Sequence, residues 1–160
     1  MAGAVVVSGV MYAFLPSDFR LWSGAAVVYP MFLLVLLAVL VIADPGRIDH
    51  ERPWLRAVTG LMIGSIVLAT VVSAVRLIAG ILTDASFSTA GQLLIIGAVI
   101  WTTNVIAFSL WYWDADAGGA AARASGRSRV ARSFVFPEMH VPEISGANWF
   151  PRYLDYLALS

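Results

Sequence analysis

The 160-residue sequence contains no cysteine and no lysine, and only 12% of its residues are charged. The absence of cysteine excludes disulfide bonds, thiolate metal sites and cysteine nucleophiles. Ten arginines balance ten acidic residues, so no excess charge indicates a nucleic acid or another polyanion as a partner. Hydrophobic residues make up 60% of the chain, which leaves too little polar surface to cover a soluble globule. The composition therefore predicts an integral membrane protein in contact with the lipid bilayer.

The sequence also lacks the spacing patterns of catalytic and cofactor sites. It contains no serine–histidine–acid arrangement, no glycine-rich phosphate loop and no helical H-E-x-x-H, so we expect neither enzyme activity nor a cofactor. Glu138, His140 and Glu143 are close together, but two prolines favour an extended segment there, and the spacing matches no standard zinc pattern. The only other histidine is His50. We therefore expect no metal site.

Three apolar segments are long enough to cross a bilayer, which requires about 20 residues. They are predicted at about 21–43, 54–82 and 89–113, whereas the apolar stretch 2–15 is too short for a full crossing. Because backbone polar groups must be satisfied inside lipid, these segments predict an all-α, polytopic transmembrane helix bundle with three to four crossings. We interpret 2–15 as a first crossing that is short or has lost its beginning, since no positive charge precedes Asp18 to mark a secretory signal.

The arginines predict the orientation, because cytoplasmic loops are enriched in basic residues. Arg47 and Arg52 follow the second apolar stretch, and five more arginines follow Trp113, whereas the turn 83–89 has no basic residue. We therefore expect a cytoplasmic N terminus and a cytoplasmic region 114–160. The expected organisation is a helix bundle at 1–113, a cytoplasmic loop at 114–150 and the start of an interfacial or truncated further helix at 151–160.

Four residues predict close helix packing inside the membrane. Gly60 and Gly64 form a small-xxx-small pair on one helix face, which permits another helix, from a second copy or from a partner, to approach closely. Ser65 lies beside them, and Asn104 lies at the same depth in the following, antiparallel crossing. We predict that these two helices pack there. We interpret Asn104 as a residue that forms a hydrogen bond between helices rather than as a ligand-binding group, because a buried amide in lipid needs a hydrogen-bond partner.

Arg76 is the one charge well inside a predicted crossing. It precedes the expected helix end at Leu82 by six residues, or about 9 Å at 1.5 Å per residue. Charges within the membrane are functional candidates. Two alternatives are open: the side chain snorkels to the outer interface or makes a structural hydrogen bond, or it lines an anion path or pairs with Gln92. We favour the first alternative.

Aromatic residues cluster at the end of the last crossing and near the end of the chain, as is typical of membrane interfaces. The predicted interfacial residues are Trp111, Tyr112, Trp113, Trp149, Tyr153, Asp155 and Tyr156. Pro151 suits the first position of a helix. Because only ten residues follow from Pro151 to Ser160, half of what a crossing requires, we expect the chain to be truncated within this helix.

Three stretches, N-V-I-A-F-S-L-W-Y-W-D (104–114), F-V-F-P-E-M (134–139) and W-F-P-R-Y-L-D-Y-L-A-L-S (149–160), resemble a family of uncharacterised bacterial multi-pass membrane proteins. In that family the last stretch continues into a Thr-rich segment and a final crossing, a layout similar to the pore helix, filter and inner helix of small cation channels. The resemblance implies a bacterial plasma (inner) membrane protein with a channel-like function, in which Asp155 and the tyrosines position the pre-pore helix.

Three functions therefore compete. The first is a channel-like or other transport protein. The second is a non-catalytic membrane scaffold or assembly subunit, which holds a partner helix on the face of Gly60 and Gly64. The third is a membrane enzyme. We rank it far behind the other two, because the sequence shows no pattern for a nucleophile, a base or a cofactor-binding loop.

Overall fold

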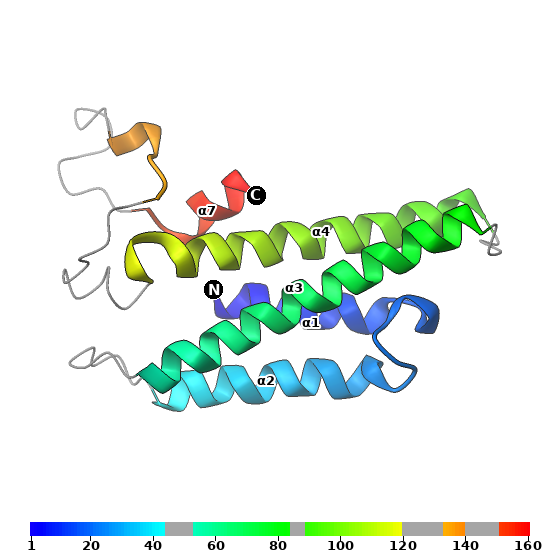
Figure 1. Ribbon diagram of the computed structural model, residues 1–160, viewed down its shortest axis with the longest axis horizontal. Coiled ribbons are helices and arrows are strands. Elements are labelled where there is room, and N and C mark those ends of the chain that lie inside the picture. Colours follow the sequence, from blue (N-terminus) through cyan, green and yellow to red (C-terminus); the bar gives the residue numbers. More distant parts are fainter. Residues whose placement is uncertain (44–52, 84–88, 120–132, 140–150) are drawn as a thin grey trace.

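A computed structural model describes residues 1–43, 53–83, 89–119, 133–139 and 151–160 (Figure 1). These ranges are helical and contain no strand, which confirms the predicted all-α fold. The α-helices are α1 (Ala2–Phe14), α2 (Ala25–Ala43), α3 (Pro53–Leu82), α4 (Ala90–Ala115) and α7 (Tyr153–Leu159). Three single 3-10 turns are η1 (Ser17–Phe19), η2 (Asp116–Gly118) and η3 (Pro137–Met139).

Helices α2, α3 and α4 are long and apolar enough to cross a membrane. The 19 residues of α2 extend about 29 Å and the 30 residues of α3 about 45 Å, compared with a hydrocarbon core of about 30 Å. The 13 residues of α1 extend only about 20 Å. The chain is therefore a multi-pass membrane protein, whose described residues form three helices of spanning length and a shorter helix beside them.

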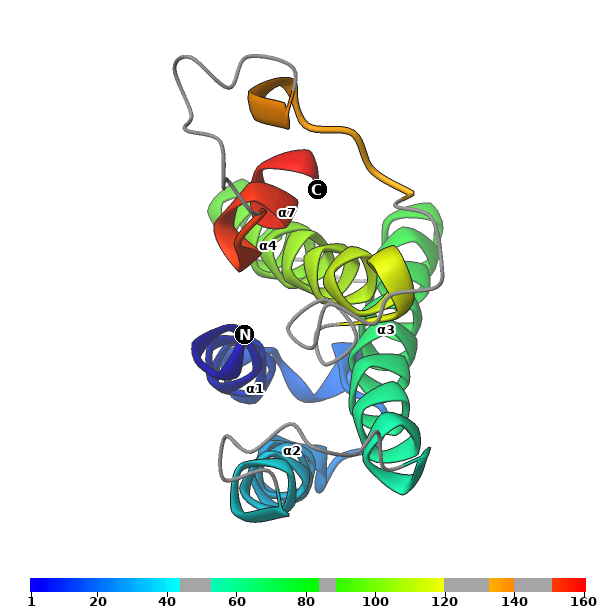
Figure 2. The same cartoon turned by 90° about the vertical axis from the view of Figure 1, so that its left-hand side faces the viewer.

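The first four helices surround a shared apolar core. Helix α1 packs against α2 and α4, and α3 packs against the same two helices, so the contacts form a closed ring (Figure 2). The buried residues of the main core are Val5, Tyr12, Ala25, Tyr29, Leu33, Met62, Ile63, Ile66, Ala69, Ile106, Ala107 and Leu110. Helix α7 packs against α4. The η1 turn, in the loop between α1 and α2, packs against α3.

Most of the apolar surface of α2 is exposed. Only Ala25, Tyr29 and Leu33 are buried, and their spacing of four residues puts them on one helix face. The ring of Tyr29 lies 4.5 Å from that of Tyr12 in α1, measured between centroids. Large side chains on the other faces would be unfavourable in water, so this helix is built for contact with lipid.

Helix α2 begins at Ala25 and not at Leu21, where the apolar run begins. The intervening chain forms a turn in which the backbone N–H of Leu21 donates a hydrogen bond of 2.6 Å to the hydroxyl of Tyr12. This bond holds Leu21 against the end of α1 and so delays the start of the next helix. The turn carries charged residues of both signs, Asp18 and Arg20, which places it at a membrane surface.

Candidate functional site

Arg76 of α3 binds the backbone of the turn between α1 and α2. Its Nη1 donates to the carbonyls of Arg20 and Asp18, the latter at 3.4 Å, and its Nη2 donates to the carbonyl of Leu21 at 3.3 Å. The hydroxyl of Ser73, one turn earlier in α3, donates to the carbonyl of Phe19 at 2.7 Å. Helix α3 therefore donates hydrogen bonds to the four successive backbone carbonyls of residues 18–21, which have no partner within a helix.

The guanidinium of Arg20 closes the end of α1. Its Nη2 donates to the carbonyl of Ala13 at 2.9 Å, one of the carbonyls at the helix C-terminus without an intrahelical partner. A cation at this position also opposes the negative end of the helix dipole. The turn is thus held from one side by its own arginine and from the other side by Arg76.

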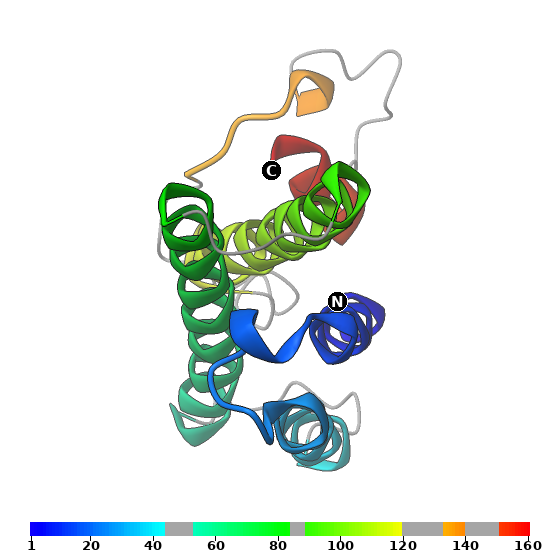
Figure 3. The same cartoon turned by 90° about the vertical axis from the view of Figure 1, so that its right-hand side faces the viewer.

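Figure 3 shows the η1 turn lying between α1 and α3, and Figure 1 shows α3 and α4 extending beyond it. Arg76 therefore lies at the same height along the bundle as the charged turn, and the residues of α3 after Arg76 extend beyond the turn. Its guanidinium makes structural hydrogen bonds, one of the two roles that the favoured interpretation of the sequence gave to Arg76. Among the described residues, its hydrogen bonds go to the turn and not to Gln92.

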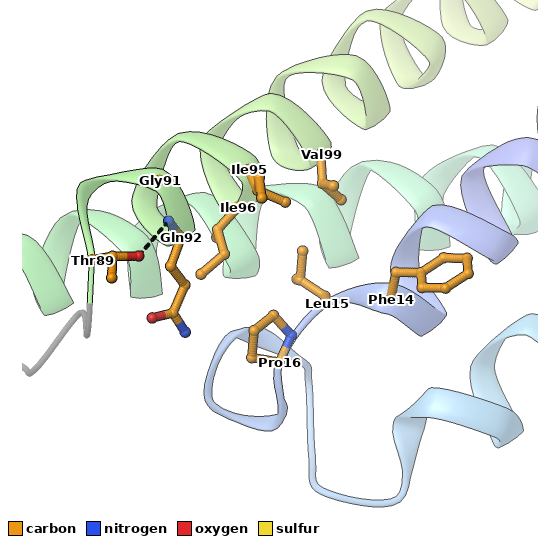
Figure 4. A pocket seen from close by; sticks show the side chains of 9 residues that line it. All are labelled: Phe14, Leu15, Pro16, Thr89, Gly91, Gln92, Ile95, Ile96 and Val99. Carbon is orange, nitrogen blue, oxygen red and sulfur yellow. Dashed lines mark hydrogen bonds between the residues drawn. The ribbon is translucent and has the colours of Figure 1, made fainter.

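A hollow of about 390 Å³ lies between the end of α1 and the start of α4 (Figure 4). Its lining residues are Phe14, Leu15, Pro16, Thr89, Gly91, Gln92, Ile95, Ile96 and Val99. Thr89 caps α4, because its hydroxyl accepts a hydrogen bond of 3.2 Å from the backbone N–H of Gln92. The lining is mainly apolar and contains neither an acid nor a base, so it offers shape for an apolar group rather than catalytic chemistry.

The opposite end of α4 carries a buried polar and aromatic cluster, which we call the clasp and define as Trp113, Asp116, Phe134, Phe136 and Tyr156. Asp116 and Tyr156 are both 0% exposed. The Oδ2 of Asp116 accepts a hydrogen bond of 2.7 Å from the hydroxyl of Tyr156. The rings of Trp113 and Phe136 meet that of Tyr156 edge-on, with centroids 5.4 and 5.2 Å away. The clasp therefore joins α4, the segment 133–139 and α7.

The second carboxylate oxygen of Asp116 binds the segment that leads to η3. Its Oδ1 accepts hydrogen bonds from the backbone N–H groups of Ser133 at 2.7 Å and Phe134 at 3.3 Å. A tight turn presents this carboxylate: Gly119 has a φ of 97°, and a Cβ there would lie 3.3 Å from the carbonyl oxygen of Asp114. The sequence interpretation missed Asp116, because no spacing pattern relates it to a tyrosine 40 residues later.

Tyr153 adds a second connection between α7 and α4. Its hydroxyl forms a hydrogen bond of 2.6 Å with the hydroxyl of Ser109. Helix α7 begins at Tyr153 and not at the predicted Pro151, because the Oδ2 of Asp155 accepts a hydrogen bond of 2.6 Å from the backbone N–H of Arg152 and makes Arg152 the N-cap. Asp155 therefore stabilises the start of its own helix.

We expect alkaline pH to weaken the docking of α7. Burial raises the pKa of Tyr153 above its ordinary value of 10.0, and the hydrogen bond with Ser109 lowers this pKa in part. Because the folded state holds the proton more tightly, the stabilisation is present below pH 10.0 and is lost as the pH rises from there toward the raised pKa. Ultraviolet titration of the protein and of Tyr153→Phe gives the ionisation of this residue by difference. A midpoint at or below the ordinary value would contradict the prediction.

The predicted aromatic belt at the end of α4 is divided between surface and packing. Trp111 is exposed, whereas the half-buried ring of Tyr112 lies 5.0 Å from that of Phe134, and Trp113 belongs to the clasp. Trp149 lies outside the described residues. So do His140 and Glu143, the loop arginines after α2 and most of the turn after α3.

Gly60 and Gly64 are exposed, and a Cβ at either position would have nothing within 4 Å among the described residues. Helices α3 and α4 pack against each other and share a buried cluster that includes Met62 and Ile106, but α4 does not pack on these glycines. At 100° per residue, Gly64 lies opposite the buried Met62 and Ile66, so the core-facing side of α3 is the other one. The hydroxyl of Ser65 donates to the carbonyl of Met62 at 2.8 Å.

Asn104 is half-buried in the middle of α4. Its amide makes no hydrogen bond with another described residue. The interhelical bond expected of it is therefore not made between α4 and the other described helices. An amide at this depth in lipid remains available to a group outside the bundle.

Comparison of the chain with protein-family models, with curated proteins and with solved structures gave no match. No relative therefore indicates a function.

Proposed function

We propose that the chain is a non-catalytic membrane assembly subunit that binds another transmembrane helix on the exposed face of α3. The observation that carries this proposal is the open space in front of Gly60 and Gly64 on a helix of spanning length. Small residues allow two helix backbones to approach closely, and close packing drives helix association in lipid, where the hydrophobic effect contributes little.

The two glycines belong to a continuous stripe of exposed residues with spacings of three or four. The stripe consists of Gly60, Gly64, Leu68, Val71, Val75, Ile78 and Leu82. This spacing matches the seam of a helix pair that crosses at a shallow angle. A partner helix on the stripe would meet small residues at one end and large apolar side chains along the rest.

Asn104 supports the same proposal from α4. Hydrogen bonds between side chains of neighbouring helices contribute about 0.6–2 kcal/mol in membranes. An amide without a partner among the described residues is suited to such a bond with an added helix. The half-burial of Asn104 leaves part of its surface accessible from outside the bundle.

We place the protein in a bacterial plasma membrane, with the N terminus and the clasp on the cytoplasmic side. The arginines of the second loop and of the region after α4 support this orientation, since basic residues are retained in the cytoplasm. The bacterial assignment is supported by the resemblance of the three C-terminal stretches. Replacing loop arginines and mapping the termini by protease protection tests the orientation.

The assembly proposal predicts that Gly64→Leu lowers association by about tenfold, equivalent to about 1.4 kcal/mol, because a leucine side chain would hold the partner backbone away. Energy transfer between differently labelled copies in liposomes measures self-association, and co-purification from native membranes measures binding to another protein. Gly3→Leu is the matched control, because Gly3 is also exposed with nothing within 4 Å of a Cβ, but it lies on α1. Equal association of both variants and the unaltered protein would contradict the proposal.

A channel-like transport function is the second candidate. The observation that favours it is the docking of α7 against α4 through Tyr153 and Tyr156, which is the contact expected of a helix that positions a following pore segment. Continuation of the reading frame after Ser160 into a Thr-rich stretch and another apolar segment would support it. Ion flux into liposomes that depends on Tyr156 would support it directly, and flux unaffected by Tyr156→Ala would count against it.

A further inference from the structure

Two guanidinium groups from different elements meet at the η1 turn. Arg76 of α3 donates to the backbone carbonyl of Arg20, and the side chain of Arg20 folds back to the carbonyl of Ala13. Within the part of the chain that the structure describes, both arginines bind carbonyl oxygens and neither forms an ion pair with a carboxylate. Two positive charges are therefore concentrated at one surface position.

These arginines retain donors that the turn does not use. The Nε of Arg20 is buried and has no hydrogen-bond partner among the described residues. Arg76 is exposed, and the turn takes only bonds from its two Nη atoms. The Nε of Arg20 is closed to a headgroup. The side chain of Arg20 is only half-buried, however, and its Nη1 makes no hydrogen bond with another described residue.

The position of the turn indicates which anion is available. A short connection leads from the turn to α2, and it carries Trp22, which is exposed by 49%, as is typical of the boundary between hydrocarbon and headgroups. Phospholipid phosphates are concentrated at that boundary. Guanidinium groups bind phosphate oxygens through paired N–H donors, which ammonium groups cannot match in geometry.

We propose that Arg20 and Arg76 bind the phosphate of an anionic phospholipid in the leaflet at the η1 turn. Arg20 supplies the main contact through its Nη1, and Arg76 adds charge while it holds the turn. Asp18 lies in the same turn, and its carboxylate, which accepts a hydrogen bond of 3.2 Å from Ser17, opposes the anion. The net local charge of these three side chains is positive, which favours an anionic headgroup over a zwitterionic one. This site does not depend on the assembly function.

Native mass spectrometry of the purified full chain with phosphatidylglycerol or phosphatidylcholine tests the proposal. We expect Arg20→Gln to weaken phosphatidylglycerol binding by about tenfold, the usual effect of losing a charge-assisted hydrogen bond. Arg56→Gln is the matched control, because Arg56 is an exposed arginine near the opposite end of α3. Equal weakening by both variants, or none by Arg20→Gln, would overturn the site.

Asp18→Asn provides a second test that leaves both arginines in place. Removal of this exposed charge is expected to tighten phosphatidylglycerol binding by roughly twofold to fivefold, because like-charge repulsion at a surface is modest. If Arg20→Gln does not fold, this variant decides, and unchanged affinity would overturn the proposal. Inorganic phosphate is the third probe: displacement of the lipid by millimolar phosphate would show a site for free phosphate and would also overturn it.

Discussion

Replacing Asp116 by alanine is expected to detach α7 from α4 while the first four helices remain folded. The substitution leaves the hydroxyl of Tyr156 and the N–H groups of Ser133 and Phe134 without their acceptor. Among these bonds, only that of Tyr156 joins Asp116 directly to α7, because those of Ser133 and Phe134 hold the segment before η3. A buried donor left unpaired costs about 1–3 kcal/mol, and we expect a loss of this size from the docking of α7. Tyr156→Phe removes the same bond to α7 and leaves the buried Oδ2 of Asp116 without this donor, so it should cost a similar amount.

Hydrogen exchange measures this effect helix by helix. Amides of Tyr153–Leu159 should exchange rapidly in Asp116→Ala, whereas amides in α3 and α4 should keep their protection. Asp18→Ala is the matched control, since it removes an exposed carboxylate from the other end of the bundle. Unchanged protection of α7 in Asp116→Ala would refute the role of the clasp, and equal loss in both variants would show a general effect of charge.

Replacing Arg76 by leucine is expected to destabilise the whole bundle by about 1.5–3 kcal/mol, the range for hydrogen bonds that involve a charged group. The carbonyls of Asp18, Arg20 and Leu21 lose their donor, and the hydroxyl of Ser73 then makes the remaining hydrogen bond from α3 to this loop. Arg76→Lys should recover only part of the loss, because one ammonium group cannot reach all three carbonyls in the geometry of a guanidinium.

Unfolding of the purified variants in denaturing detergent, followed by circular dichroism, measures this change. Arg56→Leu removes an exposed arginine near the other end of the same helix and should leave stability within about 0.5 kcal/mol. Ion flux into liposomes that contain each purified variant tests the alternative function of Arg76. Unchanged stability of Arg76→Leu together with lost flux would show that Arg76 serves an ion path and not the turn.

The helices themselves were predictable from the sequence because each is a long apolar run, and lipid forces such a run to satisfy its own backbone. The expected ends at 54–82 and 89–113 differ from α3 and α4 by at most two residues. The start of α2 was not predictable in this way, because the apolar residues after Leu21 do not reveal that the hydroxyl of Tyr12 binds its N–H.

The candidate sites were predictable only as single residues. Arg76 is conspicuous because a charge is costly inside an apolar run, and the two glycines because their spacing places them on one face. The groups that these residues contact could not be predicted from the sequence. Arg76 binds carbonyls 55 to 58 positions earlier in the chain, and no local pattern encodes such a pairing.

The sequence alone determined the class of this protein: an all-α membrane bundle, because apolar content, run length and backbone satisfaction in lipid are local properties. Only the tertiary structure decided which face of α3 enters the core, so that Met62 is buried and Gly64 is open. It also decided that Asp116, in an apparent linker, is fully buried against Tyr156. Burial and hydrogen bonding of these residues depend on segments that folding brings together from distant positions.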